Sequence, residues 1–285
     1  MNLPIENLVI TGACGGLGSA LARQALARGA RVALVGLNAK VLEALAATAP
    51  GRCAIYLPDV SDSAAMQAMA EDWLARFGVP DAVIANAGVA GGFDTAEAGD
   101  LPVFRRILEI NLLGVATTFQ PFVAPMCARG HGALVGIASL AGRRGLPGNG
   151  AYCASKGGLI RYLQSLRAEL RPSGVRVCTV NPGYLRTALT AGNRFAMPGL
   201  MAPDDAASAI LRAVARGAHT LVLPRRLGWL ACALDLLPEP WHDALLLRQP
   251  RKARAGEPGS TPIPGLPAAR PAAQAAAADA DVRER

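Results

Sequence analysis

Short apolar runs alternate with amphipathic stretches along most of this chain, and this alternation limits the fold more than any other feature. The runs lie at Leu8–Ile10, Val32–Val35, Ala54–Leu57, Ala82–Ala85, Ala133–Ile137, Val175–Val180 and Thr220–Leu223. Helical patterns separate them, near residues 17–28, 39–47, 63–76, 102–128, 151–170 and 204–215. Buried parallel strands read as continuous apolar runs because helices cover both sheet faces. We therefore predict an α/β fold in three layers, with a doubly wound, seven-stranded, mostly parallel sheet.

The 285 residues show no break in composition before about residue 250, which favours a single domain over residues 1–250. With 52% hydrophobic and 18% charged residues, the chain can bury a large core. An apolar helical segment is expected near residues 225–250. Residues 253–285 are rich in Ala and Pro and poor in large apolar side chains, so we expect a disordered tail there.

The apolar run at residues 227–237 is too short to cross a bilayer, which needs about 18–20 residues. Its apolar side chains recur at helical spacing on one face. Such a helix could cap the core, roof a substrate pocket or lie on a lipid surface, and we rank the three in that order.

The formal net charge of +8 comes from arginines in scattered pairs, which favours a solvated basic surface over a nucleic-acid site. The three histidines have no ligand-like spacing, so no metal site is predicted. The six cysteines form no CxxC pair and residues 1–6 do not resemble a secretory signal. These features predict reduced thiols and a cytoplasmic location.

A glycine-rich turn, Thr11-Gly12-Ala13-Cys14-Gly15-Gly16-Leu17-Gly18, follows the first predicted strand and opens the first helix. Glycines without Cβ atoms let backbone N–H groups at a helix start approach a pyrophosphate closely. The spacing departs from G-x-G-x-x-G, and a tight turn of ordinary function has similar residues. Taken alone, the turn is a weak signal for a nucleotide site, and it needs corroboration from a second motif.

A second motif is Tyr152-Cys153-Ala154-Ser155-Lys156, at the start of a predicted helix. A spacing of four places the phenol and the ammonium on one helix face. With 4 Tyr in the chain, and Lys still rarer, a chance occurrence of Tyr-x-x-x-Lys is improbable. The two groups can therefore cooperate chemically.

With these motifs, residues 5–224 resemble the classical short-chain dehydrogenases/reductases, whose Rossmann-like fold binds nicotinamide cofactors. Further elements match in order: Asp59-Val60, Asn86-Ala87-Gly88, Asn111, Ser139, and Asn181-Pro182-Gly183 followed by Thr187. All lie at the carboxyl ends of predicted strands or on adjoining helices, where a doubly wound sheet binds its ligand. The resemblance implies hydride transfer between NAD(P) and an alcohol or carbonyl.

The resemblance also implies four catalytic residues. Tyr152 would be the general acid/base, with its pKa lowered by the Lys156 cation. Ser139 would hydrogen-bond the substrate oxygen, and Asn111 would hold a water that relays protons to Lys156. Taken singly, each of these residues also fits an ordinary structural role.

Cofactor contacts are implied at the glycine turn and along the strand ends. They comprise Thr11, Gly12, Gly15, Gly16, Leu17, Gly18, Asp59, Val60, Asn86, Ala87, Gly88, Tyr152, Lys156, Pro182, Gly183, Leu185 and Thr187. Asp59 would reach the adenine, although an aspartate at this place can equally cap a helix. Thr187 would contact the carboxamide.

The end of the second strand bears on the choice between NADP and NAD. Members of the family that prefer NAD carry an acid where this chain has Gly36, and Leu37 replaces the arginine common in members that prefer NADP. The sequence departs from both patterns. We expect NADP rather than NAD, with Asn38 and Lys40 as candidate phosphate contacts.

A small-molecule alcohol or carbonyl, and a hydrophobic one, is the expected substrate. Ser139 and Tyr152 would bind it together with Leu140, Leu146 and Tyr184, but apolar contacts do not identify it. Two other function classes stay open: a nucleotide-binding regulator without turnover, and a membrane-surface module. The resemblance further implies a homodimer or homotetramer, paired through helices near residues 102–128 and 151–170.

Overall fold

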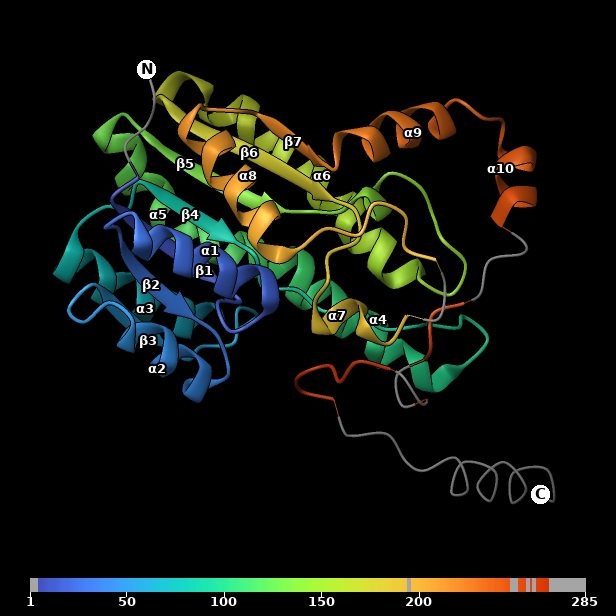
Figure 1. Cartoon of the computed structure of the whole chain (residues 1–285), viewed down its shortest axis with the longest axis horizontal. Coiled ribbons are helices and arrows are strands. Elements are labelled where there is room, and N and C mark those ends of the chain that lie inside the picture. The colour runs from blue at the N-terminus through green and yellow to red at the C-terminus, as the bar shows by residue number, and fades with distance from the viewer. Residues whose placement is uncertain (1–4, 194–195, 247–250, 255–256, 258–259, 267–285) are drawn as a thin grey trace.

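The computed structural model describes residues 5–193, 196–246, 251–254, 257 and 260–266. Within them, seven strands form one sheet in the order β3-β2-β1-β4-β5-β6-β7 (Figure 1). The strands are β1 (Asn7–Thr11), β2 (Arg31–Val35), β3 (Cys53–Tyr56), β4 (Ala82–Ala85), β5 (Gly132–Ile137), β6 (Val175–Pro182) and β7 (Thr220–Leu223). The prediction of a Rossmann-like sheet is confirmed.

Every described strand pairing is parallel, where the sequence predicted a mostly parallel sheet. Central strands are buried on both faces: Val9 of β1 pairs in register with Ala33 and Val83, and all three are fully buried. Such strands need apolar side chains at every position, which explains their continuous apolar runs.

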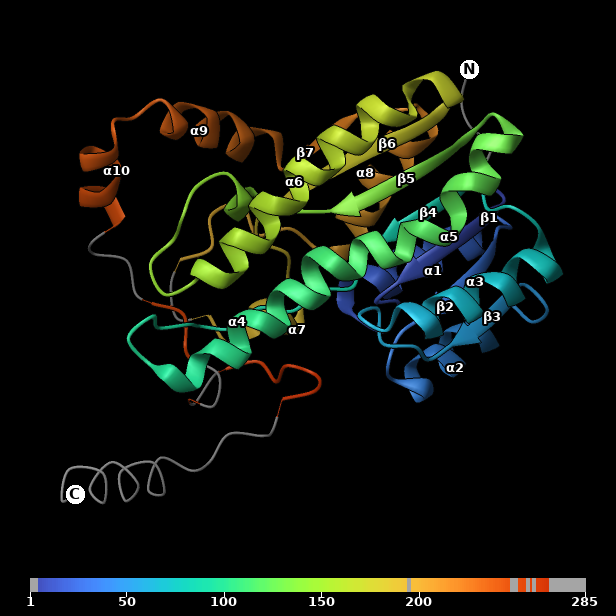
Figure 2. The same cartoon turned by 180° about the vertical axis from the view of Figure 1, so that it is seen from behind.

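Helices cover both faces of the sheet (Figures 1 and 2). The helices are α1 (Gly16–Ala27), α2 (Ala39–Ala47), α3 (Ser63–Phe77), α4 (Leu101–Leu108), α5 (Gly114–Arg129), α6 (Gly150–Leu170), α7 (Ala188–Ala191), α8 (Pro203–Ala215), α9 (Arg225–Asp235) and α10 (Glu239–Leu246). Helices α1, α2 and α8 share one apolar core with the sheet, and α3, α5 and α6 share the other. The three-layer prediction is therefore confirmed.

The long helix predicted over residues 102–128 is interrupted. A π-helical turn, η2 (Glu109–Leu113), separates α4 from α5. The continuous helical stretch Ala98–Arg129 is long and apolar enough to span a bilayer by length and composition alone. Phe119 and Phe122 of α5 are fully buried against the sheet, and the core helix of a globular domain meets the same criterion.

The C-terminal region differs from its prediction in part. Helices α9 and α10 occupy the segment where an apolar helix was expected. The chain then returns to the domain as a C-terminal strap (residues 251–254 and 260–266), in which Ile263 is only 6% exposed. The expected tail began at residue 253, and in the structure Ile263 of that range packs against Val103 and Ile107 of α4. Residues 267–285 lie outside the described residues.

Candidate active site

The predicted site residues meet at the carboxyl edge of the sheet. Strand β1 pairs with β2 on one side and with β4 on the other, so the order of the chain reverses between β1 and β4. A cavity of about 710 Å³ opens at this edge, lined by the glycine turn, by Tyr152 and Lys156, and by residues of α9, α10 and the strap.

The glycine turn forms a cradle that side chains would fill. A Cβ on Gly18 would lie 2.1 Å from the Gly12 oxygen, and one on Gly16 would lie 2.7 Å from Thr187 Cγ2. Gly12 adopts φ +65° and packs against the backbone of Ala87. The surface at the N-terminus of α1 is therefore formed by backbone atoms. Its N–H groups suit the binding of a dinucleotide pyrophosphate. Gly15, Gly16 and Leu17 line the cavity itself.

Thr11 and Asn86 brace this cradle. The Thr11 hydroxyl oxygen accepts hydrogen bonds from the backbone N–H groups of Asn86 (3.1 Å) and Ala87 (3.2 Å). The Asn86 amide donates to the carbonyls of Thr11 (3.0 Å) and Gly12 (3.2 Å). The two side chains lock the loops after β1 and β4 together, so their contribution to a cofactor site is the shape of the backbone.

The four predicted catalytic residues lie together. Ser139 follows β5 and accepts a hydrogen bond from the Ala141 N–H (3.1 Å). The Lys156 ammonium donates to the carbonyl of Ile137 (2.8 Å) and lies 5.8 Å from the centre of the Tyr152 ring. Ser139 and Tyr152 share a side-chain hydrogen bond. The end of β5 therefore holds Lys156 and Ser139 on the same side as the phenol.

Asn111 sits in the π-helical turn and is fully buried. Its amide oxygen accepts from the Val89 N–H (2.8 Å), and its amide nitrogen donates to the Val89 carbonyl (2.9 Å) and to Ser155 Oγ (3.0 Å). Both amide hydrogens are thus used within the protein. A Cβ on Gly88 would lie 3.2 Å from this oxygen and 3.5 Å from Lys156 Nζ, so the loop after β4 passes closely over both groups.

Burial shifts the two titrating groups in opposite directions. It raises the pKa of Tyr152 to about 12, which outweighs the lowering effect of the Ser139 hydrogen bond. It lowers the pKa of Lys156 to about 8. The expectation that Lys156 brings the Tyr152 pKa toward neutrality is therefore not met by the protein's own groups. The reason is that removal from water penalises both charged forms.

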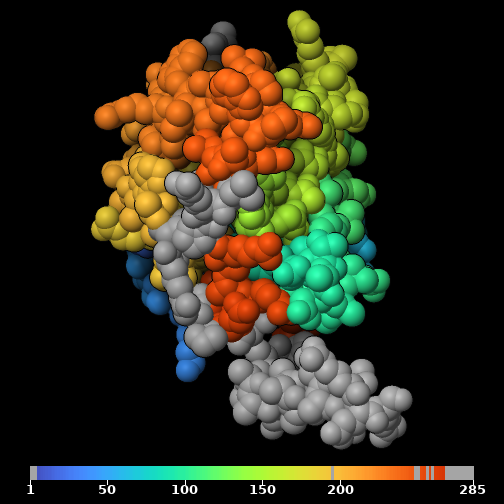
Figure 3. All heavy atoms as spheres, turned by 90° about the vertical axis from the view of Figure 1, so that its right-hand side faces the viewer, coloured from blue at the N-terminus to red at the C-terminus, as the bar shows by residue number. Residues whose placement is uncertain are grey.

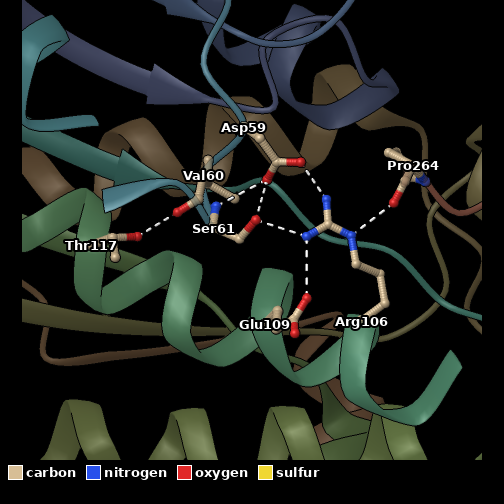
Figure 4. Close-up of polar contacts among 7 residues, drawn as sticks. All are labelled: Asp59, Val60, Ser61, Arg106, Glu109, Thr117 and Pro264. Atoms are coloured by element: carbon tan, nitrogen blue, oxygen red, sulfur yellow. Dashed lines mark hydrogen bonds and ion pairs between the residues drawn. The ribbon is translucent and has the colours of Figure 1, made fainter. Parts of the chain in front are cut away.

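Asp59 lines the cavity, but other side chains already bind its carboxylate. One oxygen accepts hydrogen bonds from the Ser61 N–H (2.9 Å) and hydroxyl (2.7 Å), and the other pairs with the Arg106 guanidinium (Figure 4). Burial alone would raise the Asp59 pKa, but these partners hold it below its ordinary value. The neighbouring Val60 lines the cavity and packs on Gly114.

The segment after β6 forms the opposite wall. Pro182, Gly183, Tyr184, Leu185 and Thr187 all line the cavity. Thr187 caps α7 through a reciprocal pair of hydrogen bonds with Thr190, and its methyl group faces Gly16. The predicted residues after β1, β4 and β6 therefore enclose one space.

Leu140, Leu146 and Tyr184 line the cavity as expected for a substrate pocket. Sequence reasoning left the role of the 227–237 run open among three alternatives. In the structure Leu227, Leu230 and Leu234 of α9 line the same cavity, so α9 roofs it.

The strap residues at this cavity, such as Lys252, were not predicted, and neither was Arg106 of α4, which contacts both the strap and Asp59. The available signal was Ile263 and Leu266, two large apolar residues between prolines in an otherwise small-residue tail. Among the described residues, no group of three or more His, Cys, Asp or Glu side chains is placed to hold a metal ion.

Residues 6–197 match the family model described as short chain dehydrogenase. The chain belongs to the short-chain dehydrogenase family. It is accordingly an oxidoreductase that uses a nicotinamide cofactor and acts on alcohol or carbonyl groups. These findings give no support to the regulator or membrane-surface alternatives.

Three relatives illustrate the range of the family. An uncharacterized oxidoreductase of Myxococcus xanthus is 38% identical over 245 residues, which cover 84% of this chain and 96% of that protein. The 2-dehydro-3-deoxy-L-rhamnonate dehydrogenase (NAD(+)) of a Sphingomonas species is 38% identical over 183 residues, which cover 64% of this chain and 72% of that protein. A short chain dehydrogenase from Burkholderia cenocepacia, solved in complex with NADP, has 26% identity and a TM-score of 0.75, and covers 88% of this chain and 100% of its own.

Proposed function

We propose that this enzyme transfers hydride between NADP and a hydrophobic alcohol or ketone, with Tyr152 as the general acid/base. The observation that carries the proposal is the single cavity that joins the glycine cradle, the Tyr152 and Lys156 pair and the apolar face of α9. A nicotinamide cofactor, when bound, supplies or accepts the hydride. The protein's own residues bind the substrate and move the proton.

In the direction of carbonyl reduction, the Tyr152 hydroxyl would donate its proton to the oxygen that gains negative charge. Its high pKa keeps the phenol protonated at neutral pH, ready to act as an acid. Ser139 would orient the substrate oxygen and stabilise the developing charge. Lys156 places a cation at the ring, which favours the tyrosinate left after the transfer.

Asn111 fits a positioning role better than direct water binding through its amide. Its amide hydrogens are donated to Val89 and Ser155, and this fixes the loop after β4 against the helix that carries Tyr152 and Lys156. A water in the proton path would therefore be held by other atoms, with Asn111 setting their geometry.

NADP is supported by the end of β2. No carboxylate lies at residues 36–38, and Leu37 is 52% exposed at the rim of the cavity. A 2′-phosphate would avoid the repulsion that an acid there would cause. Asn38 caps α2 through its oxygen, which accepts from the Val41 N–H (3.3 Å), so only its amide nitrogen is available to a phosphate.

Leu140, Leu146 and Tyr184, together with the leucines of α9, line the cavity around Tyr152 and support a hydrophobic substrate. We also propose that the enzyme works as a homodimer or homotetramer that pairs through α4, α5 and α6. The large apolar side chains Leu101 and Leu113, which are 60% and 57% exposed, lie on this helical layer.

The test combines cofactor binding with turnover. NADPH and NADH are titrated by fluorescence, and cofactor oxidation is then followed by absorbance against a panel of ketones and aldehydes. Tyr152→Phe should bind NADPH as the wild type does and lose turnover by about a hundredfold or more. Tyr162→Phe, a change of the same kind farther along α6, is the matched control and should keep full turnover. Absence of cofactor binding by the wild type would refute the proposal.

A further inference from the structure

The C-terminal strap forms part of the cavity that the proposed cofactor would occupy. Lys252, Thr261, Pro262 and Pro264 line the same space as Asp59 and Lys156. Figure 3 shows the red atoms of the strap on the outer surface, between the orange atoms of α9 and α10 and the green atoms around α4. Three separate sets of contacts hold it there.

The first contact set is ionic. Arg254 binds both oxygens of the Asp100 carboxylate, at 2.8 and 3.1 Å, and the Asp100 side chain is only 7% exposed. Burial would raise the Asp100 pKa, but the Arg254 hydrogen bond holds it below its ordinary value. Beside this pair, the Gly92 N–H donates to the Ala253 carbonyl (2.9 Å).

The second contact set is apolar. Ile263 packs with Val103 and Ile107 of α4 and with Ala151 of α6, in a small core separate from the two main ones. A Cβ on Gly91 would lie 2.9 Å from Ile263 Cδ1, so the glycine leaves room for this side chain. Removal of such a buried side chain from water favours the docked strap.

The third contact set reaches the cofactor site through a single side chain. Arg106 of α4 is 12% exposed, and its Nε donates to the Pro264 carbonyl of the strap (2.7 Å). The same guanidinium donates to Ser61 Oγ (2.7 Å) and pairs with the Asp59 carboxylate. Figure 4 shows the guanidinium between Pro264 on one side and Asp59 and Ser61 on the other.

We propose that Arg106 is a positioning residue through which the strap shapes the adenosine end of the cofactor site. The planar guanidinium has a fixed fork of donors, so the Pro264 carbonyl that orients Nε also orients the groups that bind Asp59 and Ser61. Without the strap, the Arg106 side chain gains rotational freedom, and so does the Asp59 carboxylate that lines the cavity. The inference rests on the proposed function, because it assigns a further residue to the same cofactor site.

The proposal predicts which half of the cofactor is affected. Asp59 and Val60 follow β3, whereas Tyr152 and Lys156 lie beyond β5. Loss of strap residues 260–266, which carry the Pro264 carbonyl, should therefore weaken binding of NADPH and leave binding of reduced nicotinamide mononucleotide, which lacks adenosine, unchanged. A merely stabilising role for Arg106 would lower the melting temperature without distinguishing the two ligands.

The experiment uses the full chain, Arg106→Gln, Arg106→Lys, a chain ending at residue 259, and the double change of Arg106→Gln in the shortened chain. Arg105→Gln is the matched control, because Arg105 is exposed on the same helix and its side chain has no hydrogen bond or ion pair among the described residues. Fluorescence titration gives Kd for NADPH and for reduced nicotinamide mononucleotide, and thermal unfolding reports folding.

We expect Arg106→Gln and the shortened chain each to raise Kd for NADPH about tenfold, the size expected for a lost charge-assisted hydrogen bond. The double change should be no worse than the larger single effect, because both disrupt one network. Arg106→Lys keeps the charge without the fork and should fall between wild type and Arg106→Gln. Arg105→Gln should match the wild type, and kcat at saturating NADPH should stay within twofold throughout.

An unchanged Kd for NADPH in the shortened chain would overturn this inference while leaving the proposed function intact. Equal weakening of both ligands, or additive effects in the double change, would also overturn it. Failure of the unaltered chain to bind either ligand would instead refute the proposed function itself. If Arg106→Gln does not fold, the Kd values of Arg106→Lys and of the shortened chain for the two ligands decide whether the inference holds.

Discussion

At the scale of single residues, the site is governed by how burial acts on Tyr152 and Lys156. Desolvation by the surrounding protein holds the phenol in its neutral form and lowers the pKa of the lysine to about 8. Protonated tyrosine suits carbonyl reduction, whereas alcohol oxidation requires its deprotonation. The two directions of reaction should therefore respond differently to pH.

The first residue-scale prediction concerns Lys156. Its pKa is lowered from 10.5 to about 8, so the ammonium is lost as pH rises through 8. Because the neutral amine no longer attracts the cofactor, Kd for NADPH should rise between pH 8 and 9.5, by up to tenfold per pH unit. Fluorescence titration across this range checks it.

Burial also lowers the pKa of Lys252, so substitutions are needed to show which of the two lysines causes the pH effect. Lys156→Arg stays charged and should remove the rise in Kd, whereas Lys252→Arg should retain it. A flat profile in the wild type would contradict the prediction. The effect of pH on folding stability runs the other way. Between pH 8 and 10.5 the Lys156 side chain binds more protons in the unfolded chain than in the folded one, so the contribution of Lys156 to the free energy of unfolding increases as pH rises.

The second residue-scale prediction concerns cofactor choice at Leu37. Leu37→Arg places a guanidinium at the rim of the cavity, beside the space left by Gly36. It should tighten NADPH about tenfold through a charge-assisted bond to the 2′-phosphate and leave NADH within twofold. Leu37→Gln, which adds a neutral amide, should change neither ligand to this extent. Equal tightening of NADPH and NADH by Leu37→Arg would show that the added charge does not read the phosphate.

At the scale of elements, the π-helical turn η2 is the feature that connects the helical layer to the site. It carries Asn111, whose three hydrogen bonds tie the loop after β4 to α6. A regular helix would rotate this side chain away from Val89. The π-helical turn therefore places the Asn111 amide where it can bind Val89 and Ser155.

Asn111→Ala should leave the half-buried N–H and carbonyl of Val89 without their side-chain partner and should lower the free energy of unfolding by about 2 kcal/mol. Turnover should fall at the same time, because the loop over Lys156 is no longer fixed. Urea unfolding and kcat measure the two effects. Asn111→Asp keeps the acceptor for the Val89 N–H but sets a buried carboxylate oxygen against the Val89 carbonyl, so it should lose at least as much stability as Asn111→Ala. Wild-type stability in Asn111→Ala would contradict this account of the turn.

The sequence predicted the elements well where burial is uniform. Each predicted strand overlaps its observed strand, because a central strand such as β4 is apolar at every position. The glycine turn and the Tyr152 and Lys156 pair were predictable for a related reason: their chemistry depends on short local spacing. The family resemblance then placed Ser139 and Asn111.

Other features had no local signature. The partners of Asp59 are separated from it by up to 47 residues, and Arg106 and Pro264 by 158, so no periodicity connects them. The π-helical turn leaves the apolar pattern of its helix intact. The Tyr152 pKa depends on how completely the folded chain excludes water, which spacing alone does not give.

At the scale of the whole molecule, the helical layer of α4, α5 and α6 is the surface proposed for pairing of subunits. Leu113→Asp puts a charge on this layer and should convert an oligomer into monomers at micromolar concentration, because an unpaired buried charge is costly. Light scattering after size-exclusion chromatography measures the mass. Leu236→Asp is the control, because Leu236 is 86% exposed at the end of α9, outside the layer of α4, α5 and α6. It should leave the mass unchanged. A monomeric wild type would refute the proposed pairing.

The strap also imposes an order on how the enzyme is made. Pro264 follows Arg106 by 158 residues, so at about 5–20 residues per second a ribosome completes the strap about 8–30 s after the guanidinium it will bind. All seven described strands, and Tyr152 and Lys156 with their proposed catalytic roles, precede it in the chain. A nascent domain can therefore assemble its sheet before the adenosine end of the site is finished. A message cut short after α10 would yield a protein with every proposed catalytic group and a weakened hold on its cofactor.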